Sequence, residues 1–105
     1  MKLDKFLGML GLAMRAGRVV IGFDEIAKAT ARSKIHLVIV SSGASEGTKK
    51  KIRTKCEFYN LTKITVDVEG DELGRRLGKT SAPVCLGITD EGFAETLIRL
   101  SACED

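Results

Sequence analysis

The sequence predicts an α/β fold in which helices cover both faces of a four-stranded, mostly parallel or mixed sheet, giving a three-layer α/β/α sandwich. Short apolar segments alternate along the chain with longer segments whose apolar residues recur at helical spacing, as expected for such a fold. The run from Ile35 to Val40 is apolar and rich in β-branched residues, as in a central strand buried on both faces. The chain has no internal repeat, linker or low-complexity segment, so residues 1–105 are expected to form a single domain.

In the first half of the chain, an amphipathic helix is predicted over residues 2–15, with Gly17 ending it, because apolar residues recur there every three or four positions. A short apolar strand follows at residues 19–21. A second helix is predicted from a turn at Gly22 to about residue 33.

Within this second helix, the spacing of the side chains predicts which residues face the core. Ile26 and Ala29 point inward, which leaves Lys28 and Arg32, four residues apart, together on another face.

In the second half, three polar residues are expected to cap helices, namely Ser45, Asp71 and Asp90. A helix is predicted to reach Tyr59, with Ile52, Cys56 and Tyr59 on its apolar side. It is followed by a strand over 64–68 nearer the sheet edge, a short helix with Leu73 and Leu77, and a loop over 78–83. The chain is then expected to form a strand over 84–88 and a last helix with Phe93, Leu97 and Leu100 facing inward.

The sequence offers little support for catalysis or for a bound cofactor. Its three cysteines are an odd number without C-x-x-C spacing, which argues against disulfides and zinc and favours a reducing cytoplasm. The single histidine, His36, is interpreted as structural. The segment ending in Gly78 lacks the first glycine of a phosphate-binding loop, since Leu73 stands at that position. We therefore expect a binding protein with no enzymatic activity, no cofactor and no metal.

Charged residues near the N-terminus interrupt the apolar ones, and the longest apolar run is far too short to span a membrane. We expect a cytoplasmic monomer without a membrane partner.

Charge is unevenly distributed along the chain. Residues 1–55 contain twelve Lys and Arg against four Asp and Glu, whereas residues 56–105 contain five against ten. Lys49 and Lys50 begin a lysine-rich stretch that ends at Lys55. If the fold gathers these side chains on one face, they would suit a polyanion; otherwise they form an ordinary solvated surface.

The stretch from Gly22 to Ala29 carries the main functional hypothesis. It closes a strand, turns through a glycine and begins a helix, and helix starts present unpaired N–H groups that favour oxygen-rich ligands such as a nucleic-acid backbone.

Four motifs follow one another along the chain: Gly22-x-x-Glu25-x-x-Lys28-Ala29, Lys34-Ile-His-Leu-Val-Ile-Val, Thr48-Lys-Lys-Lys and Leu73-Gly74-x-x-x-Gly78-Lys79. In their order and spacing the chain resembles the kink-turn-binding ribosomal proteins. This superfamily includes large-subunit proteins seven-Ae and thirty-e and small bacterial homologues. The resemblance covers nearly the whole chain. It implies the α/β/α fold and the recognition of structured RNA, a kink-turn or similar bent internal loop, in ribosomal or regulatory RNA and without catalysis.

The resemblance also implies roles for individual residues. Glu25 would accept hydrogen bonds from guanine N–H groups and Lys28 would donate to guanine O6, while Gly22 would allow close backbone approach. The loop of Thr80, Ser81, Ala82, Pro83 and Val84 would cover an extruded nucleotide.

The chain departs from the superfamily at Phe23 and Asp24, where RNA-binding members usually carry Thr-Asn. An asparagine amide can donate to guanine O6, whereas a carboxylate only accepts and adds negative charge near phosphates. Kink-turn binding is then expected to be weaker, altered in preference or absent. Asp24 has a second interpretation as a helix cap, and Glu25 with Lys28 as a surface pair. The alternative function is a protein-interaction module on the same fold, using the acidic second half.

Overall fold

The computed structural model describes residues 3–32, 34–78 and 83–102. Helices and strands alternate along this part of the chain, as the sequence predicts. The elements are α1 (Leu3–Arg15), β1 (Val19–Ile21), α2 (Phe23–Ala31), β2 (Leu37–Ser41), α3 (Glu46–Tyr59), β3 (Lys63–Val66), α4 (Gly70–Arg76), β4 (Cys85–Ile88) and α5 (Glu91–Ala102). The Cα radius of gyration is 12.4 Å, as expected for one domain of this length.

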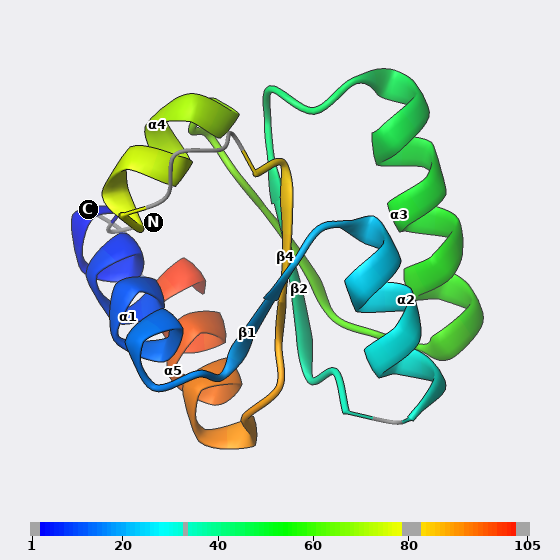
Figure 1. Ribbon diagram of the computed structural model, residues 1–105, viewed down its shortest axis with the longest axis horizontal. Helices are drawn as coiled ribbons and strands as arrows, with labels where there is room; N and C mark the ends of the chain where they lie inside the picture. Colours follow the sequence, from blue (N-terminus) through cyan, green and yellow to red (C-terminus); the bar gives the residue numbers. More distant parts are fainter. Residues whose placement is uncertain (1–2, 33, 79–82, 103–105) are drawn as a thin grey trace.

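The four strands form a mixed sheet in the order β1-β4-β2-β3. Only β2 and β3 pair in parallel; β4 lies between β1 and β2 and runs antiparallel to both. The expectation of a mixed sheet is confirmed, but the sheet is not mostly parallel. The reason lies in α4, which stays at the end of the sheet where β3 finishes, so the chain enters β4 from that same end (Figure 1).

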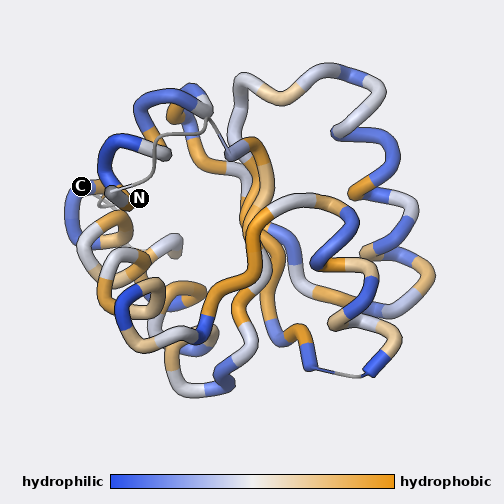
Figure 2. The backbone as a smooth tube through the Cα atoms, in the orientation of Figure 1, coloured by the Kyte–Doolittle hydropathy of each residue, from blue (hydrophilic) through white to orange (hydrophobic). Residues whose placement is uncertain are grey.

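Helices cover both faces of the sheet, which confirms the three-layer sandwich. Figure 1 shows α1, α4 and α5 on one side and α2 and α3 on the other. The most apolar stretches of chain are the strands between these two layers, whereas polar residues dominate the helices, above all α3 (Figure 2). Strand β2 is buried at every position, as predicted for a central strand.

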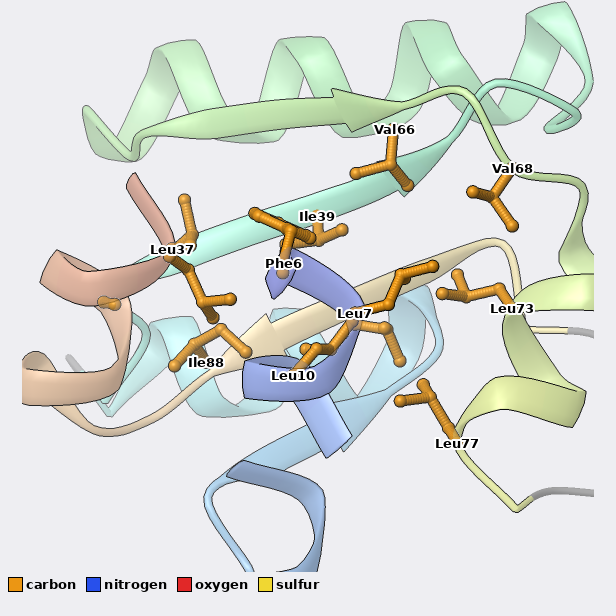
Figure 3. Packing of buried hydrophobic residues seen from close by; sticks show 13 residues of the cluster. Phe6, Leu7, Leu10, Leu37, Ile39, Val66, Val68, Leu73, Leu77 and Ile88 are labelled. Atoms are coloured by element: carbon orange, nitrogen blue, oxygen red, sulfur yellow. The ribbon is translucent and has the colours of Figure 1, made fainter. Parts of the chain in front are cut away.

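The larger core cluster fills the side of the sheet covered by α1, α4 and α5. Phe6 and Leu10 of α1 are fully buried there with Leu37 and Ile39 of β2 (Figure 3). Leu97 of α5 is fully buried in the same cluster. Each such side chain contributes about 1.5–3 kcal/mol through burial.

The smaller core cluster lies beneath α2 and α3. Because successive side chains of a strand point to opposite faces, Val38 and Val40 of β2 face this side. Ile26 of α2 and Ile52 and Cys56 of α3 pack against them. The predicted inward positions of Ile52 and Cys56 in α3 and of Ile26 and Ala29 in α2 are thereby confirmed.

Two of the three predicted helix caps are confirmed. The Ser45 hydroxyl accepts a hydrogen bond from the Thr48 N–H at 3.2 Å, and the Asp90 carboxylate accepts one from the Phe93 N–H at 2.9 Å. Asp71 is not a cap, because α4 begins earlier, with Glu69 in the N-cap position.

Three further details differ from the sequence interpretation. Strand β3 ends at Val66 instead of residue 68, because the Val68 N–H turns back to the Val66 carbonyl at 2.9 Å. Tyr59 is 42% exposed, although its spacing put it on the apolar side of α3. The side chain of His36 is exposed, so it contributes little to the core.

Candidate RNA interface

The start of α2 is shaped by Gly22. This residue is the N-cap of the helix, with φ at 94° and ψ at 153°, a backbone conformation that is almost restricted to glycine. Glycine has no side chain to accept hydrogen bonds from the first N–H groups of α2; its carbonyl accepts only the regular helical bond from the Ile26 N–H, at 3.0 Å. A Cβ atom at this position would meet nothing within 4 Å. Glycine is therefore required by backbone conformation, and the space beside it is open to a ligand.

The sheet places the segment before β4 next to Gly22. Ile21 lies opposite Leu86 in the antiparallel pair of β1 and β4, and the Gly22 N–H donates to the Cys85 carbonyl at 3.1 Å. On the other side of this segment, the Ser41 N–H donates to the Val84 carbonyl at 2.8 Å. The turn at Gly22 and the segment before β4, which lie far apart in the sequence, thus meet where β1 ends and β4 begins.

Of the predicted loop, Pro83 is buried and Val84 is half-buried. Val84 packs against the same core cluster as Phe23. The other predicted loop residues, Thr80, Ser81 and Ala82, lie outside the described residues.

Glu25 and Lys28 are both exposed and lie one helical turn apart. The Lys28 ammonium is 3.5 Å from the Glu25 carboxylate, which is the surface pair that the spacing allowed. Such exposed pairs contribute only about 0.2–1 kcal/mol, so the two side chains can separate at little cost when a ligand approaches.

Asp24 is exposed and lies in the first turn of α2. Gly22 already occupies the N-cap position, so the interpretation of Asp24 as the cap is wrong. Its negative charge still stabilises the helix start through the macrodipole. The carboxylate is consequently free to meet a ligand, where it would repel phosphates and attract hydrogen-bond donors.

The remaining predicted cations are spread over two helices. Arg32 is the C-cap of α2, at the opposite end of the helix from Asp24 and about 12 Å away along its axis. Lys49 is partly buried and lies 3.7 Å from Glu46. Lys50 is exposed and forms no ion pair with the described residues. Only Lys50 of these three is brought close to the start of α2.

A groove of about 830 Å³ runs between the first turn of α2 and the outer side of α3. Its lining residues are Phe23 and Asp24 of α2 and Gly47, Lys50, Lys51, Thr54, Lys55, Phe58 and Tyr59 of α3. Phe58 is not among the residues that the sequence predicts to bind RNA. Its spacing contained the signal, because Phe58 follows Lys51 and Thr54 by seven and four residues and so belongs to the lysine side of α3.

The described residues contain no group of three or more His, Cys, Asp or Glu side chains that could hold a metal ion. Cys56 and Cys85 are buried, and burial raises the pKa of both thiols above the ordinary value of 9.0. They are poor nucleophiles at neutral pH. No helix in the described part of the chain has the length and hydropathy needed to cross a membrane.

Comparison with known proteins identifies the family. Residues 4–98 match the ribosomal protein L7Ae/L30e/S12e/Gadd45 family. This chain belongs to that family. The resemblance seen in the sequence motifs is thereby confirmed over nearly the whole domain.

Relatives within the L7Ae/L30e/S12e/Gadd45 family include proteins named for RNA binding and for the ribosome. RNA-binding protein YlxQ of Bacillus subtilis is 40% identical over 92 residues, covering 88% of this chain and 90% of that protein. Large ribosomal subunit protein eL30 of Sulfolobus acidocaldarius is 32% identical over 94 residues, with 90% of each chain covered. A solved structure of a protein with unknown function from Bacillus halodurans C superposes with a TM-score of 0.86 at 38% identity, covering 92% of this chain and 96% of that one.

Proposed function

We propose that this protein binds structured RNA, a kink-turn or similarly bent internal loop, through the start of α2 and the segment that precedes β4. The observation that carries the proposal is the meeting of Gly22 with residues 83–85 at one edge of the sheet, beside the exposed Glu25 and Lys28. The names of the relatives, RNA-binding protein and ribosomal protein, support the same substrate class.

In this proposal, base edges are read by the pair on α2. Lys28 donates to guanine O6 and Glu25 accepts from guanine N–H groups, which requires their 3.5 Å contact to open. Gly22 lets the RNA approach the backbone, since no Cβ fills the open space there. Residues 80–84 cover an unstacked nucleotide.

Lys50 and its neighbours on α3 contact phosphates. Such contacts add affinity without selecting sequence. We further propose that the protein acts as a monomer in the cytoplasm and catalyses no reaction. Ribosomal RNA is one candidate target.

The decisive experiment is a titration of a kink-turn RNA against a control RNA in which the G·A pairs are replaced, at fixed salt. We expect tighter binding of the kink-turn. Lys28→Ala should cost about 1–3 kcal/mol of binding free energy for the kink-turn, because a base contact is lost. Lys50→Ala should weaken both RNAs alike and reduce the salt slope by about one, because a phosphate contact is lost.

Equal and weak binding of the two RNAs would contradict the proposal and leave only nonspecific electrostatic attraction. Absence of binding to both would favour the alternative of a protein-interaction module.

Asp24→Asn tests the departure from the superfamily. Since Asp24 does not cap α2, the substitution should lower the free energy of unfolding only by the lost helix-dipole interaction, about 0.3–1 kcal/mol. It should tighten kink-turn binding by removing a charge and restoring an amide donor. Asp71→Asn is the matched control, because Asp71 is also exposed in the first turn of a helix, on the other face of the sheet. Equal effects of the two substitutions would mean that only net charge matters.

A further inference from the structure

The groove between α2 and α3 combines exposed aromatic rings with lysines. Phe58 is 80% exposed, the largest exposure among the large hydrophobic residues of the described chain. Its ring meets that of Tyr59 edge to face, with 4.9 Å between centroids. Phe23, half-buried, contributes a third aromatic ring to the lining from the first turn of α2. One exposed apolar side chain would be ordinary, but three aromatic rings gathered at one groove form an exposed apolar patch of the kind that marks a binding surface.

Cations line the same groove. The Lys55 ammonium lies 5.3 Å from the centroid of the Tyr59 ring, within cation–π range. Lys50 and Lys51 are exposed and make no ion pair within the described part of the chain. Asp24 is the one carboxylate among the described residues that line it. The groove therefore attracts an anion along α3 while offering ring faces to planar groups.

The groove is also continuous with the proposed RNA site. Phe23 and Asp24 belong both to its lining and to the turn that follows Gly22. From Gly47 to Tyr59 the α3 side of the groove extends for about 18 Å along the helix axis. A strand leaving an RNA bound at the start of α2 can thus enter the groove without crossing another element.

We propose that this groove binds a single-stranded RNA segment that extends from the structured RNA held at the start of α2. Unpaired bases stack on Phe58 and Tyr59, and their phosphates face Lys50 and Lys51. Aromatic stacking and backbone neutralisation are the two interactions by which proteins hold single strands without sequence preference. The proposal rests on the RNA-binding function proposed above and adds a second contact to it.

Charge favours RNA over a protein partner as the occupant. An RNA strand offers planar bases and a continuous anionic backbone together, which matches lysines that run along the groove beside the rings. The rings stay accessible in the free protein, which suits bases that are already unstacked.

The experiment compares two RNAs, one kink-turn with blunt ends and the same kink-turn carrying a short run of unpaired nucleotides. In the wild-type protein the extension should tighten binding by about 5- to 100-fold, the range expected for stacking of one base on an aromatic ring. Phe58→Ala should reduce this gain by about 5-fold or more, because one of the two stacking rings is lost while Tyr59 remains, and it should leave binding of the blunt RNA unchanged. Leu12→Ala is the matched control, because Leu12 is 46% exposed on α1, on the far side of the sheet.

Tyr59 supplies a direct readout. It is the only tyrosine and the chain has no tryptophan, so tyrosine fluorescence reports on this groove alone. The extended RNA should quench it more than the blunt RNA does. Tyr59→Phe should lose the signal and keep the affinity gain, because a ring remains.

An extension that adds no affinity to the wild-type protein, while the blunt kink-turn still binds specifically, would overturn the groove proposal and leave the proposed function intact. If the protein binds neither of the two RNAs more tightly than the G·A-replaced control, the proposed function is wrong, and the groove proposal that rests on it falls with it. A synthetic Glu/Leu peptide helix that shifts the Phe58 and Tyr59 ring signals in NMR spectra, when the RNA extension does not, would assign the groove to a protein partner.

Discussion

Replacing Gly22 by alanine tests whether the backbone at the start of α2 is held in a conformation that only glycine adopts easily. With φ at 94° and ψ at 153°, an alanine there should be strained by about 1–3 kcal/mol. The lower entropy of the unfolded chain offsets about 0.4–1 kcal/mol of this. No steric clash is added, since the Cβ atom would meet nothing within 4 Å. From the middle of each range, we expect the free energy of unfolding to fall by roughly 1.3 kcal/mol.

Gly8→Ala is the control with the opposite expected sign. Gly8 lies inside α1, is exposed, and also has nothing within 4 Å of an added Cβ atom. The same chemical change should stabilise the protein there by about 0.5–1 kcal/mol, because alanine is the better helix former. Urea unfolding followed by circular dichroism measures both. A neutral or stabilising Gly22→Ala would refute the reasoning, because it would show that the turn relaxes freely to an ordinary conformation.

Two further predictions concern the core beneath α2 and α3. Gly87→Ala should lower the free energy of unfolding by about 1–3 kcal/mol, because its Cβ atom would lie 2.8 Å from Ile35 Cδ1 and 3.1 Å from Ile26 Cγ1; an unchanged urea midpoint would mean that these side chains move aside. Burial raises the pKa of Cys56 and Cys85, so the unfolded chain loses these protons first as pH rises. The two thiols should therefore not affect the free energy of unfolding at pH 7, but this free energy should fall as the pH rises past about 9. Urea titrations at several pH values should show a smaller fall in a variant with both cysteines changed to valine.

Local sequence patterns were sufficient for much of the fold. Apolar spacing correctly placed Ile26 and Ala29 on the inner side of α2, because helix geometry alone decides which side chains share a face. The caps Ser45 and Asp90 were also found, since a cap acts within three residues of itself. The cap predicted at Asp71 was wrong because α4 begins at Gly70, which puts Glu69 in the N-cap position without a side-chain hydrogen bond.

The candidate site was only partly accessible to the same reasoning. Family resemblance and the glycine-led turn pointed to Gly22, Glu25 and Lys28, and these residues do gather at one exposed helix start. The groove was not predicted, because it depends on how α3 lies beside α2. Single-sequence spacing could have shown Phe58 on the lysine side of α3, but not the ring and carboxylate that face it from α2.

By itself, then, the sequence determined which segments become helices and strands, which faces they bury, and where the chain can turn sharply. These are consequences of interactions between residues close together along the chain. Only the tertiary structure decided that β4 enters between β1 and β2, and with it that residues 83–85 lie beside Gly22. Strand order depends on hydrogen bonds between segments far apart in the sequence, and the site is built from that order.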